Sequence, residues 1–177
     1  MLLVTSGRLV SQKGYESLLE ACNKLNKDNI KYKLWILGED WARPKLEELI
    51  NKYRLSNIKL LGFKENPYKY IKQGDLFVCS SKNEGFLLVI AEAMILGLPV
   101  ISTSCSGPNE FLNFGQFGHI VENNEEALYK GLKEIINNDE KLKYYKKKSK
   151  ERVDFFNYKN RISDIERVFN DDYQTKN

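Results

Sequence analysis

Two glutamates, Glu84 and Glu92, stand eight positions apart and have neighbours that mark them as candidate binding residues. Glu84 precedes Gly85, and Glu92 lies in the apolar run Ala91–Ile95. A carboxylate in such surroundings is costly unless it is paired or meets a ligand. Carboxylates can accept hydrogen bonds from sugar hydroxyls, and an acidic residue in nucleotide-binding folds holds a ribose. The alternative is a pair of carboxylates on a helix and its preceding loop, without any ligand.

A second candidate group, Arg8 and Lys13, lies in the stretch Gly7–Gly14 near the start of the sequence. Glycines let a backbone approach a ligand closely, a guanidinium offers a planar fork of donors, and a lysine offers a mobile point charge. The N-terminus of the helix that follows adds a partial positive charge. This combination suits a phosphate or diphosphate, although an ordinary loop with exposed Arg and Lys has the same pattern.

Several other kinds of site are excluded by pattern. The Gly7–Gly14 stretch matches neither G-x-x-x-x-G-K-[ST] nor G-x-G-x-x-G. The three cysteines, Cys22, Cys79 and Cys105, lack metal-ligand spacing, and the start of the sequence lacks the features of a signal peptide. We therefore expect free thiols in a reducing compartment. The single histidine, His119, excludes a His-rich metal site within this sequence, and we expect it to be structural.

Short apolar runs alternate with segments of helical periodicity, which predicts an α/β fold. The apolar runs are continuous rather than alternating, as is typical of a parallel sheet covered on both faces in a doubly wound domain. The predicted strands are 1–6, 32–37, 58–61, 76–79, 99–102 and 118–121. The predicted helices are 14–25, 44–53, 88–96 and 125–136, with short helical pieces near 67–71 and 107–108.

The candidate residues follow predicted strands directly. Arg8 follows the first strand and Glu84 the fourth, while Gly38 and Gly62 end the second and third. Ligands of doubly wound sheets bind at the carboxyl ends of the strands, near the point where strand order reverses. We therefore expect these positions to converge on one rim of the sheet.

The length of 177 residues and the apolar content of 42% predict one domain with a real core. No apolar run reaches the roughly 18 residues of a membrane-spanning helix. We expect the domain to occupy 1–140, helices packed on it to occupy 141–171, and a disordered tail to occupy 172–177. Residues 141–177 carry 11 Lys/Arg and 6 Asp/Glu, which fits an acidic partner, a membrane surface or a solvated helix face.

Taken together, these stretches resemble the C-terminal, donor-binding domain of retaining glycosyltransferases of family 4, which have the GT-B fold. The spacing of Glu84 and Glu92 equals the E-x7-E motif of that family. Six pieces in the right order carry the resemblance: Gly7–Gly14, Leu37–Gly38, Leu60–Tyr68, Asp75–Ser81, Glu84–Thr103 and Ser106–Glu110.

The resemblance implies a Rossmann-like domain, one half of a GT-B fold, that binds a nucleotide-sugar donor. It implies that Arg8 and Lys13 hold the diphosphate and stabilise the leaving group, and that Glu84 contacts the transferred sugar. It also implies that Glu92 binds the ribose hydroxyls.

Further donor contacts follow from the same resemblance. Backbone groups near Phe63 and Lys64 read the base, and Gly7 lets the chain approach the diphosphate. The N–H groups of Phe86, Leu87 and Leu88 face the sugar and diphosphate.

The chemistry implied is transfer of a hexose with retention, without an essential metal or any cofactor beyond the nucleotide-sugar co-substrate. A UDP-sugar is the favoured donor, and a glycan or lipid-linked molecule of polysaccharide biosynthesis the acceptor. The expected location is the cytoplasm, with peripheral contact at the inner face of the membrane, and no nucleic acid partner is expected.

The acceptor domain of this family is missing from the sequence, so we expect little or no activity from this part alone. The alternatives are a non-catalytic nucleotide-sugar-binding module or split subunit, and a sugar-nucleotide epimerase of similar architecture.

Overall fold

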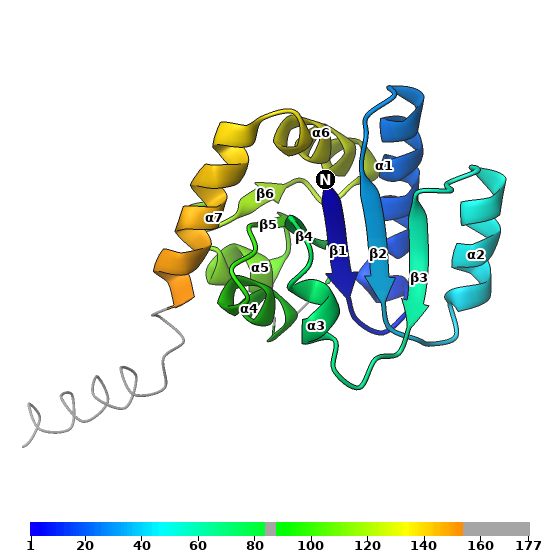
Figure 1. The fold of residues 1–177 in the computed structure, drawn as a ribbon, viewed down its shortest axis with the longest axis horizontal. Helices are drawn as coiled ribbons and strands as arrows, with labels where there is room; N and C mark the ends of the chain where they lie inside the picture. The colour runs from blue at the N-terminus through cyan, green and yellow to red at the C-terminus, as the bar shows by residue number, and fades with distance from the viewer. Residues whose placement is uncertain (84–87, 154–177) are drawn as a thin grey trace, which may run out of the picture.

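The computed structural model describes residues 1–83 and 88–153. Their centre is a parallel sheet with the strand order β3-β2-β1-β4-β5-β6 (Figure 1). The strands are β1 (Leu2–Ser6), β2 (Lys33–Leu37), β3 (Ile58–Gly62), β4 (Leu76–Cys79), β5 (Val100–Thr103) and β6 (His119–Val121). The predicted parallel sheet of six strands is confirmed, and every strand end lies within one residue of its predicted position.

Helices cover both faces of the sheet (Figure 1). One face carries α1 (Tyr15–Lys27), α2 (Arg43–Lys52) and α6 (Glu125–Ile136). The other face carries α3 (Tyr68–Ile71), α4 (Leu88–Ile95) and α5 (Ser106–Phe111). A short 3-10 helix, Ser11–Lys13, precedes α1.

Alternation along the strands produces two apolar cores, one for each helical layer. Leu3 and Val78 pack with α1, α2 and α6, whereas Val4 and Phe77 point to the opposite layer. All four residues are fully buried because β1 and β4 lie in the middle of the sheet. This explains why these strands read as continuous apolar runs rather than as alternating patterns.

The local signals for helices match the observed ends. Asn124 caps α6, since its side-chain oxygen accepts the N–H of Ala127 at 2.8 Å, and acidic residues occupy the first turn of that helix. Pro44 lies in the first turn of α2, where its missing N–H is not needed.

The last described helix, α7 (Asp139–Val153), packs against α4 and α6. Near its end, Arg152 donates its Nε–H to the carbonyl of Phe111 at 3.0 Å, and its guanidinium lies 4.9 Å from the ring centre of Phe117. The predicted continuation of helix to 171 and the predicted tail at 172–177 lie outside the described residues.

Gly14 allows the loop after β1 to touch the end of β4. Its φ is 65°, and a Cβ at this position would stand 1.9 Å from the carbonyl oxygen of Ser80. No side chain fits that distance, so the loop and the strand end approach as closely as they do only because residue 14 is a glycine.

Replacing Gly14 by alanine should destabilise the protein by about 3 kcal/mol, because a left-handed backbone cost and an overlap with a carbonyl add together. Gly97 also has positive φ, 84°, but nothing lies within 4 Å of its missing Cβ. Gly97→Ala should therefore cost only about 1 kcal/mol. Urea unfolding gives the free energy of unfolding of both variants. Equal losses of stability would show that the close contact with Ser80 adds no cost at position 14.

Candidate functional site

The strand order reverses between β1 and β4, which are neighbours in the sheet although β2 and β3 separate them in sequence. The helix after β1 packs on one face and the helix after β4 on the other. The two helices therefore leave the carboxyl end of the sheet in opposite directions, and the crevice between their starts is the usual place for a ligand in such folds.

Lys13 lies in this crevice. It helps to line a hollow of about 10 Å³ that Thr5, Tyr15, Ser80 and other residues of β1, β4 and α4 enclose. Its side chain crosses Gly7, since the Lys13 Cε lies 3.2 Å from the position of a Cβ on that glycine. The sequence placed Gly7 and Lys13 in one site, and in the structure the Lys13 side chain occupies the space beside Gly7 that a larger residue would need.

Arg8 is exposed at the same rim on an anchored loop. The N–H of Leu9 donates to the carbonyl of Glu39 at 3.3 Å, and that of Ala42 donates to the carbonyl of Leu9 at 3.0 Å. The Arg8 guanidinium makes no hydrogen bond or ion pair with any residue in 1–83 or 88–153. Its donors are thus available to an anion at the rim.

Glu92 has a partner that the sequence analysis did not identify. The Tyr68 hydroxyl at the start of α3 donates to Glu92 Oε1 at 3.0 Å, and this bond raises the pKa of Tyr68. The buried face of α4 consists of Ile90, Ala93 and Met94, whereas Glu92 is half-buried and lies outside that face. Its second oxygen, Oε2, accepts no bond from a described residue.

The proposed base-reading positions follow β3, two strands from β1 along the same edge. Phe63 is 73% exposed, and the Nζ of Lys64 lies 5.3 Å from the ring centre of Tyr70. They follow the carboxyl end of β3, on the predicted rim. Leu88 begins α4 and is 60% exposed.

Three predicted site residues, Glu84, Phe86 and Leu87, lie outside the described residues. Their roles at the sugar and diphosphate stay predictions.

Buried hydroxyls gather beneath the rim. Of the six buried polar side chains among the described residues, five lie at the carboxyl ends of β1, β4 and β5: Thr5, Ser80, Ser81, Ser102 and Thr103. Ser80, Ser102 and Thr103 donate their hydroxyls to nearby carbonyls, as Ser80 Oγ does to Lys13 at 2.9 Å. Polar groups thus replace apolar ones where the core approaches the crevice.

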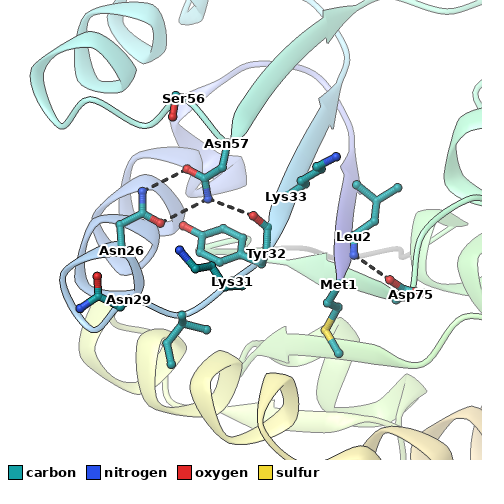
Figure 2. A pocket seen from close by; sticks show the side chains of 11 residues that line it. Met1, Leu2, Asn26, Asn29, Lys31, Tyr32, Lys33, Ser56, Asn57 and Asp75 are labelled. Carbon is teal, nitrogen blue, oxygen red and sulfur yellow. Dashed lines mark hydrogen bonds between the residues drawn. The ribbon is translucent and has the colours of Figure 1, made fainter.

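A hollow of about 660 Å³ lies at the opposite, amino ends of β1 and β2 (Figure 2). Its polar groups bind one another. The amides of Asn26 and Asn57 exchange hydrogen bonds of 3.0 and 3.2 Å, and Asp75 accepts the N–H of Leu2 at 2.7 Å. The Asn26–Asn57 pair joins α1 to the start of β3.

His119 lies on β6, away from the crevice, between α6 and α7. Its ring centre is 5.8 Å from that of Tyr145, and its Nε2 is 3.6 Å from Glu134. Burial lowers the pKa of His119, and the charge of Lys141 lowers it further, against the opposing effect of Glu134. The environment is that of a packed side chain, which agrees with the structural role predicted for it.

Residues 1–83 and 88–153 contain no group of three His, Cys, Asp or Glu side chains able to hold a metal ion. Within the same residues, every helix is too short or too polar to cross a bilayer.

Comparison with solved structures confirms that the sheet is the Rossmann-like domain of a GT-B fold. TarM of Staphylococcus aureus superposes with a TM-score of 0.79 at 27% identity over 86% of this chain and 31% of that chain, and one of its structures contains UDP and alpha-GlcNAc-glycerol. The pneumococcal O-GlcNAc transferase GtfA, at 22% identity, superposes with a TM-score of 0.83 over 96% of this chain and 35% of that chain, which shows the fold.

Sequence relatives are glycosyltransferases. The chain is 36% identical over 157 residues to an enzyme of Campylobacter jejuni, N-acetylgalactosamine-N,N'-diacetylbacillosaminyl-diphospho-undecaprenol 4-alpha-N-acetylgalactosaminyltransferase, covering 87% of this chain and 42% of that protein. It is 42% identical over 113 residues to an uncharacterised glycosyltransferase of Methanocaldococcus jannaschii, covering 63% of this chain and 28% of that protein.

The chain spans less than half the length of these curated relatives. The family model described as "Glycosyl transferases group 1" matches residues 1–152, which is most of the chain and includes the crevice between β1 and β4. The chain therefore belongs to the group 1 glycosyl transferases.

Proposed function

We propose that this chain is the donor-binding half of a retaining hexosyltransferase that takes its sugar from a nucleotide diphosphate, with a UDP-sugar favoured. The observation that supports the proposal is the arrangement of charged side chains at the carboxyl end of the sheet. Lys13 and Arg8 stand on the loop after β1, and Glu92 lies on α4 across the crevice; the Arg8 guanidinium and Glu92 Oε2 have no partner within residues 1–83 and 88–153. Cations and a hydroxyl acceptor on one rim match the two polar parts of a nucleotide diphosphate.

The same geometry suits the chemistry. When the glycosidic bond breaks, negative charge grows on the diphosphate leaving group. Fixed cations such as Arg8 and Lys13 stabilise that charge more in the transition state than in the ground state, which is what catalysis requires. They would also replace a divalent metal in that role, so we propose a metal-independent reaction with no cofactor beyond the co-substrate.

The acceptor is proposed to be a glycan or a lipid-linked molecule, and it would enter through a second domain. Four exposed apolar or aromatic side chains lie around the carboxyl end of the sheet: Trp41, Phe63, Tyr68 and Leu88. A rim of this kind is suited to closure by another domain, and reaction requires donor and acceptor to be oriented together. This half alone is therefore proposed to bind donor but transfer little, and a non-catalytic binding subunit is the competing proposal.

The Lys13→Ala variant should bind UDP at least about tenfold more weakly than the wild type, because a charge-assisted contact to the diphosphate is lost. Isothermal titration calorimetry with UDP and with GDP measures the loss and the base preference. The matched control is Lys31→Ala, which removes an exposed lysine at the hollow of Figure 2 and should leave the affinity unchanged. If Lys31→Ala weakens UDP binding and Lys13→Ala does not, the nucleotide binds at the amino end of the sheet, and the proposed site is wrong.

Glu92→Gln should weaken UDP binding about fivefold to tenfold but change the binding of 2′-deoxy-UDP much less, since the carboxylate is proposed to accept the ribose hydroxyls. Tyr68→Phe should have a smaller effect in the same direction, because it removes the group that orients Glu92. Calorimetry with the two nucleotides separates the effects. Equal losses for both nucleotides would reject the ribose contact.

We propose that sugar transfer requires a second domain, so it is tested on a protein that contains this chain together with an acceptor domain. Incubation of such a protein with a UDP-sugar and a lipid-linked acceptor should give product, whereas binding without any turnover would favour the non-catalytic subunit.

We also propose that α7 contacts an anionic membrane surface peripherally, at the cytoplasmic face. Lys143, Lys146, Lys147 and Lys150 are all exposed and fall within about 100° of arc on this helix. None of the four makes an ion pair with a described residue. The opposite side of α7 is buried at Tyr145 and Ser149, so the lysine face points away from the protein.

The chain should float with phosphatidylcholine vesicles only when these contain phosphatidylglycerol, because each lysine near an anionic surface contributes about 1 kcal/mol. Changing the four α7 lysines to glutamine should reduce the bound fraction more than tenfold, and added salt should do the same. The control changes Lys27, Lys31, Lys52 and Lys59 to glutamine, which alters the net charge equally. Similar losses in both quadruple variants would mean that net charge alone attracts the vesicles.

A further inference from the structure

Residues 80–83 follow β4 and form neither strand nor helix. They are nevertheless hydrogen-bonded to the loop after β1. The N–H of Lys82 donates to the carbonyl of Gln12 at 2.8 Å, and the side-chain amide of Gln12 donates back to the carbonyl of Asn83 at 2.9 Å. Ser80 Oγ donates to the carbonyl of Lys13 at 2.9 Å. We call residues 80–83 the β4 strap.

The other side of the β4 strap is tied to β5 and β6. Thr103, the last residue of β5, donates its hydroxyl to the carbonyl of Ser81 at 2.7 Å. Asn123, two residues after β6, directs its Nδ2 at three carbonyls: Lys82 at 2.9 Å, Ser81 at 3.3 Å and Ser104 at 3.3 Å. Its one amide therefore joins the loops that follow three adjacent strands.

The chemistry of these contacts restricts the residue type. Three carbonyl oxygens converge on Asn123, so only a hydrogen-bond donor is compatible with the position. Gln12 must both accept through its backbone and donate through its side chain. Because no regular ladder holds the β4 strap, these side chains replace it, and without them the strap would regain conformational freedom.

We propose that Asn123 and Gln12 are positioning residues, which hold Lys13 in place through the β4 strap. The inference rests on the proposed function of Lys13 at the donor diphosphate. Asn123 has no hydrogen bond to the Gly7–Gly14 loop, and its effect on Lys13 passes through Ser81 and Lys82 to Ser80 and Gln12.

The test measures amide hydrogen exchange by NMR, and UDP affinity by calorimetry, on the whole chain. Asn123→Ala should speed exchange at the N–H of Lys82 and at the N–H of Lys13, which donates to Val10 at 3.0 Å. The expected increase is about fivefold to tenfold, and UDP affinity should fall about threefold or more. Asn123→Asp should raise the exchange rates and lower the UDP affinity further, because a carboxylate would then face three carbonyls.

The matched control is the neighbouring Asn124→Ala. It removes the cap of α6, so it should lower the unfolding midpoint, but it should leave both amides and UDP binding unchanged. Gln73→Ala is the control for Gln12→Ala, because Gln73 donates to the carbonyl of Lys69, its neighbour one turn earlier, and has no bond to the strap.

Two results separate this inference from the proposed function. If Asn123→Ala behaves like Asn124→Ala, with lower stability but unchanged exchange at Lys13 and unchanged UDP binding, the positioning role is wrong. If the wild type binds no UDP, the proposed function fails, and the exchange at Lys13 alone decides whether Asn123 controls that residue. Losses of Gln12→Ala and Asn123→Ala that simply add in the double variant would show that the two do not share the β4 strap.

Discussion

The close contact between Gly14 and the carbonyl of Ser80 is the constraint on which the carboxyl end of the sheet depends. At this point the loop that leads into α1 crosses the end of β4, and the two backbones touch where no side chain would fit. The contact brings Lys13 beside β4, and it lets Gln12 exchange hydrogen bonds with the β4 strap. The shape of this end of the sheet therefore depends on contacts between backbones and not on its charged side chains.

The strand order then decides how charge is distributed around that crevice. Because α1 and α4 leave the sheet on opposite faces, Lys13 and Glu92 come from segments on different layers, and they form no ion pair with each other. Glu92 instead accepts a hydrogen bond from the hydroxyl of Tyr68, a neutral donor. A site with separated cations and carboxylate is suited to a ligand that carries both phosphates and hydroxyls.

The rest of the domain is built to hold this rim still. Two separate apolar cores fix β1 and β4 from both sides, and three buried hydroxyls beneath the crevice, those of Ser80, Ser102 and Thr103, donate to nearby carbonyls. Above them the surface becomes apolar again at Trp41 and Phe63. This order, with a packed core, a hydrogen-bonded layer and an exposed aromatic edge, fits the proposal that a second domain completes the cleft.

The sequence by itself determined the fold and the family resemblance. Continuous apolar runs such as Leu76–Cys79 are typical of strands buried on both faces, and the predicted strand ends lie within one residue of the observed ones. The rule that ligands meet the carboxyl ends of parallel strands then placed Arg8, Lys13 and Glu92 on one rim without coordinates.

Only the tertiary structure decided which residues touch. Tyr68 is separated from Glu92 by 24 positions, and Asn123 from Ser81 by 42, so no local spacing connects either pair. The apolar neighbours of Glu92 in sequence indicated burial, whereas the helix turns the carboxylate to the side of its packed face. Local pattern determines which elements form, because propensity and periodicity are local. Long-range pairing depends on how the crossovers return the chain, and that is a property of the packed sheet as a whole.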